Sequence, residues 1–182
     1  MGSSYNPVIP NPLTVALGGT GATTASAART NLGIVRKRVA ADQTITSTTD
    51  NTPITDLALP IVAGEVWTIE MGLFAVVAST APGIIVSVTT TGTVSSFRCQ
   101  VNYIANGGST VGSGLQTTEA TANIDRVIFP YGGVSTDPMF VQGFMDVVVT
   151  GSGVFNINFA QASSSVDGTT IRRGSFINAV RH

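Results

Sequence analysis

The sequence predicts an all-β protein: a jelly-roll-like β-sandwich head, preceded by an extended N-terminal arm and one short helix. Three observations predict this fold. Short apolar runs alternate with polar residues at a period of two, the pattern of half-buried strands. Turn residues such as Gly, Pro, Asn, Asp and Ser separate these runs at short intervals. After residue 34, no stretch has the pattern of a long helix.

The chain divides into three expected parts. Residues 1–17 contain three prolines, which fix φ and remove backbone donors, so we expect an extended anchoring arm there. A disordered terminus is the alternative for this segment. Residues 18–34 form a Gly/Thr-rich segment with a short helix, which we call the collar. Residues 35–182 form the β-sandwich head.

The longest strand signal runs from Val66 to Ala78. Its first half alternates apolar and polar residues, with Trp67 among the apolar ones that should enter the core. From Leu73 onward both faces are apolar, and a second apolar face needs a cover. A neighbouring subunit is the simplest cover, so Leu73, Phe74 and Val76 are candidate subunit-interface residues.

The remaining elements follow from similar runs. The other expected strands are 38–47, 54–59, 84–89, 97–103, 126–129, 141–149, 155–159 and 171–180. Residues 106–114, 131–138 and 163–169 should be loops, residues 150–153 a hairpin connection, and Gly143 a bulge.

Composition excludes several function classes. Charged residues are only 10% of the 182, against about 25% in an ordinary globular chain, which favours a surface partly covered by oligomer contacts. The net charge is −1, whereas nucleic-acid binding domains are usually basic, so no nucleic-acid partner is expected. No apolar run approaches the ~18 residues of a membrane-spanning helix, so membrane insertion is not expected either.

The residues of catalysis and metal binding are scarce. The single histidine, His182, is the last residue, and the single cysteine, Cys99, alternates with apolar residues as a buried side chain would. A Ser–His or Cys–His nucleophile pair and a zinc site are therefore not expected. Glu65 and Glu70 point to opposite faces of a strand, although a carboxylate pair between strands stays open. We expect no enzyme, and no catalytic, metal-binding or cofactor-binding residue.

Residues 17–34 read LGGTGATTASAARTNLGI. The early glycines permit a sharp turn, and Gly33 stands where a left-handed C-terminal cap belongs. A nucleotide-binding loop is an alternative interpretation of the Gly-Thr-Gly sequence. A phosphate loop requires a lysine followed by Ser or Thr after its last glycine, and the only lysine is Lys37. A nucleotide cofactor is therefore not expected.

A helix of about two turns should follow Thr23 or Thr24, either of which can cap its first N–H groups. Isolated helices shorter than ~12–15 residues are marginal in water, so this helix needs support from outside itself. Ala25, Ala28 and Leu32 share one face, and the small residues there would allow close approach of neighbouring helices.

The collar sequence resembles a segment that recurs in fibre proteins of tailed bacteriophages, usually just before a terminal β-rich head. The segments near 59–74 and 167–181 are similar to phage fibre heads with a jelly-roll, tumour-necrosis-factor-like trimer fold. The resemblance implies a non-enzymatic virion structural protein, assembled in the host cytoplasm and carried as a homotrimer on the virion surface. It also implies that the collar trimerises, through Gly18, Gly19, Gly21, Thr23, Ala25, Ala28, Arg29 and Leu32.

Two locations on the virion are open. The absence of a shaft favours a capsid decoration or head-fibre protein, whereas heads that follow this collar often serve adhesion, which favours a tail fibre or receptor-binding tip. The expected partners are further copies of the chain, another virion protein bound by the arm, and a glycan or protein of the host surface. Tyr131 is the candidate ligand contact, with packing at a turn as the alternative. The basic run 36–38 is either a solvated strand edge or a docking contact to an acidic virion surface.

Overall fold

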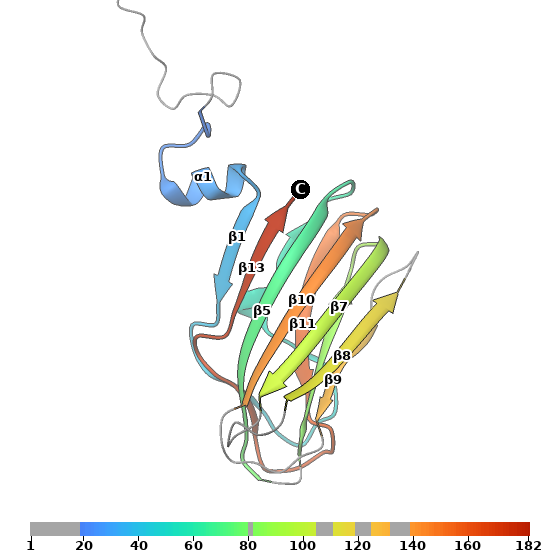
Figure 1. Cartoon of the computed structure of the whole chain (residues 1–182). Helices are drawn as coiled ribbons and strands as arrows, with labels where there is room; N and C mark the ends of the chain where they lie inside the picture. Colours follow the sequence, from blue (N-terminus) through green and yellow to red (C-terminus); the bar gives the residue numbers. More distant parts are fainter. Residues whose placement is uncertain (1–18, 80–81, 105–110, 119–124, 132–138) are drawn as a thin grey trace, which may run out of the picture.

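The computed structural model of the protein describes residues 19–79, 82–104, 111–118, 125–131 and 139–182, of which those between 103 and 131 are described by their backbone (Figure 1). Two antiparallel sheets pack against each other, and one short helix precedes them. The predicted all-β, jelly-roll-like sandwich is therefore confirmed. The 1–17 arm and Gly18 lie outside the described residues.

The larger sheet, sheet A, has eight strands and the path β1-β13-β5-β10-β7-β8, with β12 pairing β5 and β2 pairing β12. Its strands are β1 (Ile34–Arg38), β2 (Gln43–Ile45), β5 (Val66–Val77), β7 (Val94–Ile104), β8 (Val111–Thr118), β10 (Met139–Val149), β12 (Thr169–Ile171) and β13 (Phe176–Arg181).

The smaller sheet, sheet B, has five strands and the path β3-β11-β6-β9, with β4 pairing β11. Its strands are β3 (Thr52–Pro53), β4 (Leu59–Ile61), β6 (Ile84–Thr90), β9 (Asp125–Tyr131) and β11 (Gly153–Ala160). The helix α1 spans Ala25–Asn31, and a single 3-10 turn, η2, spans Thr55–Leu57.

The core lies between the two sheets and follows the predicted alternation. Phe97 of sheet A and Phe155 of sheet B are fully buried, with ring centroids 6.5 Å apart. Trp67 is 4% exposed, as its place in the alternation predicted. The strand predicted from 66 onward is confirmed as β5.

Several predicted boundaries were wrong. Residues 38–47 form two strands rather than one, because the chain leaves β1 at Val39, whose N–H donates to the carbonyl of Ser175 (2.8 Å), before β2 begins. Residues 171–180 are likewise divided between β12 and β13 by a turn in which the Ser175 N–H donates to the Arg172 carbonyl. Residues 54–59 contain the 3-10 turn, and β4 includes Pro60.

Two turn assignments were also wrong. Residues 150–153 join β10 of sheet A to β11 of sheet B, so they cross between sheets and do not close a hairpin. Gly143 forms no bulge, since it pairs in unbroken register with Met71 and Val101. Part of the expected loop 106–114 belongs to β8, and the rest lies outside the described residues.

Glu65 fastens the turn between β4 and β5 to the C-terminal strand. Its carboxylate accepts hydrogen bonds from the Val62 N–H (2.8 Å), Trp67 Nε1 (2.9 Å) and the Arg181 guanidinium (2.8 Å). Burial alone would raise the pKa of Glu65. The three hydrogen bonds and the charge of Arg181 outweigh this effect, so the pKa lies below its ordinary value of 4.5.

Candidate functional site

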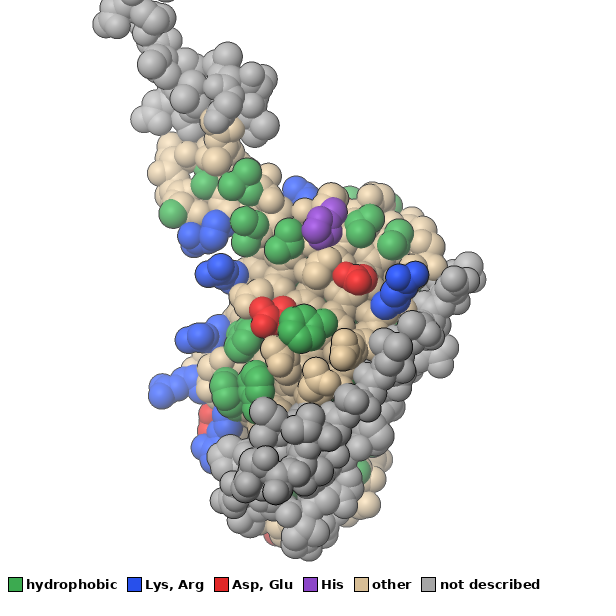
Figure 2. All heavy atoms as spheres, in the orientation of Figure 1, with side chains coloured by type: hydrophobic (Ala, Val, Ile, Leu, Met, Phe, Trp, Pro, Cys, Tyr) green, Lys and Arg blue, Asp and Glu red, His purple; other side chains and the backbone are tan. Residues whose placement is uncertain are grey.

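The outer face of sheet A, which Figure 2 views, carries an uncommon number of aromatic side chains. Four of the eight phenylalanines of the chain point outward from the central strands β13, β5 and β10: Phe74, Phe140, Phe144 and Phe176. Phe74 is 39% exposed and Phe144 is 43% exposed, while the other two are half-buried. We call these four residues the aromatic face.

Gly72 allows three of these rings to lie close together. A Cβ atom at this position would stand 2.5 Å from Cε1 of Phe176 and 3.0 Å from Cε2 of Phe140, so both rings occupy the space that a side chain would fill. The rings of Phe74 and Phe140 are adjacent, with centroids 5.0 Å apart. The result is a cluster of three rings on the solvent side of the sheet, and exposed apolar clusters mark interaction sites.

The three candidate interface residues of β5 separate onto two faces. Leu73 is fully buried in the core between the sheets, so a second subunit is not needed to cover it. Phe74 and Val76 point to the outer face, Phe74 exposed and Val76 half-buried. Only these two can meet a neighbouring subunit, and the expectation for Leu73 is corrected accordingly.

A second feature, the basic edge, borders the aromatic face. It consists of Arg36, Lys37 and Arg38 on β1, the outermost strand of sheet A, and Arg172 and Arg173 in the turn between β12 and β13. These are five of the nine Lys and Arg residues of the chain. Figure 2 shows Lys and Arg side chains in a column on the side of the head where β1 lies in Figure 1.

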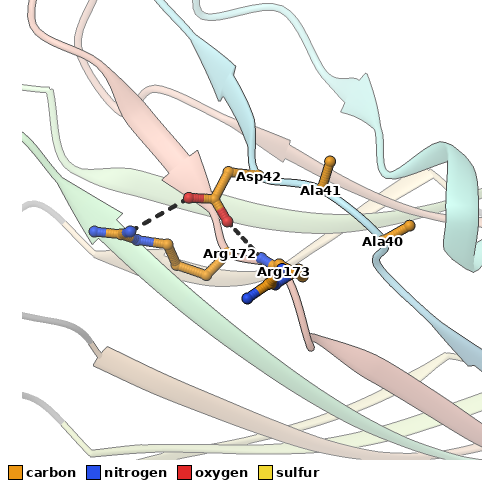
Figure 3. Close-up of a pocket in the computed structure, with 5 residues that line it drawn as sticks. All are labelled: Ala40, Ala41, Asp42, Arg172 and Arg173. Carbon is orange, nitrogen blue, oxygen red and sulfur yellow. Dashed lines mark hydrogen bonds and ion pairs between the residues drawn. The ribbon is translucent and has the colours of Figure 1, made fainter.

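Asp42 neutralises one end of the basic edge (Figure 3). Its carboxylate accepts a hydrogen bond from the backbone N–H of Arg173 (2.7 Å) and forms an ion pair with the guanidinium of Arg172 (3.3 Å). These groups line a shallow depression together with Ala40 and Ala41. Because about half of each charged side chain is exposed, this pair contributes about 1 kcal/mol or less to stability.

The predicted collar helix is present, and Thr24 rather than Thr23 caps it. The Thr24 hydroxyl accepts a hydrogen bond from the Ala27 N–H (3.1 Å), and Gly33 has the predicted left-handed conformation with φ of 73°. The helix buries none of its residues within the chain, and Leu32 after it is 58% exposed. The segment also contains five of the expected trimerisation residues, none of which is buried in the chain: Gly19, Gly21, Ala25, Ala28 and Arg29.

Polar groups also meet at the C-terminus. The Thr68 hydroxyl donates to the Asp146 carboxylate (2.9 Å) and lies 3.1 Å from Nε2 of His182. The hydroxyl stands between the imidazole and the carboxylate, whereas a catalytic triad places the histidine in the middle. Burial raises the pKa of the Cys99 thiol to about 12, so the thiol stays protonated and unreactive.

Three further expectations concern metal ligands, membrane-spanning helices and Tyr131 in the described part of the chain. No three of its His, Cys, Asp and Glu side chains gather closely enough to hold a metal ion. None of its helices is long and apolar enough to cross a membrane. Tyr131 ends β9 and pairs with Ile84, but its side chain lies outside the described residues.

The aromatic face was missed at the sequence level, although a signal for it was present. In β10, Phe140 and Phe144 occupy the positions between core residues, where a solvated strand would carry polar groups. Gly72 of β5 lies directly between Phe176 of β13 and Gln142 of β10 on the outer face. This alignment can be recognised only when the register of the three strands is known.

Comparisons with known proteins give little further information. No protein-family model matches the chain, and no curated protein does. Among solved structures, the VP2 subviral particle of infectious bursal disease virus matches 81% of this chain and 40% of its own chain, with 13% identity and a TM-score of 0.23. T=1 particles derived from the same virus match 81% and 38%, with 11% identity and a TM-score of 0.24. The chain thus spans about two fifths of the length of these chains, and TM-scores this low carry no argument.

Proposed function

We propose that this chain is a non-enzymatic structural protein of a tailed-phage virion, a short homotrimeric appendage with its β head outward. The arm of residues 1–17 would bind another virion protein, and the collar would hold three chains together. The appendage would decorate the capsid, as a decoration or head-fibre protein does.

The observation that carries this proposal is the exposed collar helix. The sequence of α1 and its flanking glycines resembles phage fibre collars, and the seven-residue helix has no buried residue in a single chain. A helix this short is not stable by itself, so it requires partners. Copies of the same helix, brought together by Ala25, Ala28 and Leu32, supply such partners with residues already present.

The aromatic face supports self-association of the head as well. The rings of Phe74, Phe140 and Phe144 lie on the central strands β5 and β10, where a second copy of the head can cover them. Half-buried Val76 extends the same face of β5. Aromatic residues are enriched in the cores of protein interfaces, and four phenylalanines lie on this face, with the charged Glu70 opposite Phe144. Phe74 and Phe140 are therefore the residues that we expect a neighbouring subunit to bury.

A second candidate function is a tail fibre or receptor-binding tip that adheres to the host surface. The specific observation in its favour is the β1 part of the basic edge, because Arg36, Lys37 and Arg38 form no ion pair among the described residues and would suit an acidic surface polymer. The two functions share the trimer and differ in where the arm attaches.

The experiment begins with the native mass of the purified full chain, measured by light scattering and native mass spectrometry. A trimer is expected, and a monomer at micromolar concentration would contradict the proposal. Gold-labelled antibody fragments against the head would then be imaged on phage particles that carry the chain. Label distributed over the capsid supports the decoration role, label confined to the tail supports the adhesion role, and unlabelled particles would overturn both.

A further inference from the structure

We infer that the outer side of the β1–β13 pair is a binding site for acidic sugars, with Arg36 and Arg38 holding the carboxylate and Phe176 and Asn178 contacting the ring. This inference goes beyond the proposed virion role and does not depend on it. The site is a depression of about 470 Å³, within the roughly 300–1,000 Å³ range of small-molecule sites. It is lined by Arg36, Lys37, Arg38, Phe176 and Asn178.

The register of β1 against β13 brings these side chains together. Arg36 lies directly opposite Asn178, and Arg38 lies directly opposite Phe176. All four point outward, since Ile177 and Ala179, which alternate with Phe176 and Asn178 on β13, are buried in the core. Side chains directly opposite on neighbouring strands have Cβ atoms about 5 Å apart, and residues two apart on one strand are separated by about 7 Å. Two guanidinium groups, one ring and one amide therefore surround a space of sugar size.

The cations of this depression are uncompensated. Within the described residues, Arg36, Lys37 and Arg38 form no ion pair. The neighbouring depression at Arg172 differs, because Asp42 occupies it with a carboxylate and would repel an acidic ligand. The same comparison identifies the ligand chemistry: Asp42 lines the Arg172 depression, whereas no carboxylate lines the Arg36–Arg38 depression. Glu70 lies beyond Asn178 in the same row.

The other two side chains distinguish an acidic sugar from a simple anion. Arginine forks bind carboxylates with two parallel hydrogen bonds, which accounts for the acid group. The ring of Phe176 offers an apolar surface to the C–H face of a pyranose. Asn178 carries an amide that can exchange hydrogen bonds with hydroxyls, although its Nδ2 now donates to Glu70 (3.0 Å). An acidic peptide or a nucleic acid would need the charges but not this combination of ring and amide.

The test measures binding of defined probes to the full chain by calorimetry and NMR. The probes are tetrasaccharides of galacturonic and glucuronic acid, neutral maltotetraose, a hexaglutamate peptide and a thymidine oligonucleotide. We expect saturable binding of at least one acidic tetrasaccharide and none of maltotetraose. Arg36→Gln and Arg38→Gln should each weaken binding about tenfold, as loss of a charge-assisted contact does. Phe176→Leu should weaken it as well, because the flat ring surface is lost.

Arg98→Gln is the matched control, since Arg98 is an exposed arginine at the far side of the same sheet face. It removes the same charge and should leave binding unchanged. The inference is overturned if neither acidic tetrasaccharide binds, if Arg36→Gln and Arg38→Gln bind as the wild type does, or if hexaglutamate or the oligonucleotide binds equally well. Both arginine variants change solvated side chains, so they keep the test valid even if Phe176→Leu fails to fold.

Discussion

The outer faces of the two sheets differ in the side chains that they carry and in how far a single chain covers them. On β6 and β11 of sheet B, two outward polar residues are hydrogen-bonded within the chain: Ser87 is fully buried and donates to Asn51 (2.9 Å), and Asn158 is 1% exposed and donates to Thr89 (3.0 Å). On sheet A, the outward residues at the centre are phenylalanines, and two of them remain more than a third exposed.

This difference shows where outward side chains are already covered within a single chain and where they are still exposed to water. Buried polar groups are tolerated only when they are hydrogen-bonded, and those of sheet B have found their partners in the segment around β3 and in neighbouring strands. Contact between exposed aromatic rings and water is unfavourable, and burial of the rings under another apolar surface lowers the free energy. The outward side of β6 and β11 is therefore covered within the chain around Ser87 and Asn158, whereas the exposed rings of sheet A offer apolar area that a second molecule can bury.

The largest expected effect comes from neighbouring residues on β5. Leu73→Glu places a charge in the closed core, and we expect it to destabilise the head by about 5 kcal/mol or more, which is comparable with the total stability of many domains. Phe74→Glu should cost only about 1 kcal/mol in folding but should abolish association through the aromatic face. Chemical denaturation and native mass, measured on both variants, check these outcomes. A folded, associated Phe74→Glu protein would contradict the assigned interface.

The next largest effect is expected from loss of the Glu65 carboxylate, which lies away from both outer faces. This substitution should change the free energy of unfolding without changing association. Glu65→Ala leaves Trp67 Nε1 and the Val62 N–H without their acceptor, which should destabilise the head by about 1–3 kcal/mol. Because the folded pKa of Glu65 is lowered, its stabilisation is present above the unfolded value of 4.5 and is lost as pH falls through the folded pKa.

The stability difference between wild type and Glu65→Ala should therefore be full at pH 7 and shrink below about pH 4.5. Denaturation curves at a series of pH values check this, with native mass at neutral pH as the control. A difference that stays constant down to pH 2 would show that the charge of Glu65 contributes nothing.

A smaller effect is expected from Gly72→Ala, which acts on the aromatic face without adding charge. The new methyl group would displace the rings of Phe176 and Phe140, a repacking that costs roughly 1–3 kcal/mol when it occurs in a closed core and less at a partly open surface. We expect weaker association with a nearly unchanged unfolding midpoint, measured by sedimentation over a concentration series. Gly143→Ala, on the opposite side of the same sheet against Met71, is the control and should change folding instead.

The sequence predicted the elements whose signal is local. The alternation around Trp67 located β5, and the capping pair Thr23 and Thr24 with Gly33 located the helix, because each signal depends on neighbouring residues only. What failed depends on contacts across the fold. Residues 38–47 and 171–180 appeared continuous, since nothing local reveals that Val39 and Ser175 leave their strands to bond to each other. Likewise, the composite site of Arg36, Arg38, Phe176 and Asn178 joins segments about 140 residues apart, and only the β1–β13 register brings them together.

The smallest effect tests the claim that the outward side of β6 is covered within the chain around Ser87. Ser87→Ala removes the donor to Asn51, and we expect a loss of about 1 kcal/mol in the free energy of unfolding. Native mass and acidic-sugar binding should not change, because this residue lies on the sheet opposite to both proposed interfaces. A loss of association in this variant would show that sheet B also meets a neighbour, and the contrast between the two faces would then no longer identify the side on which the protein assembles.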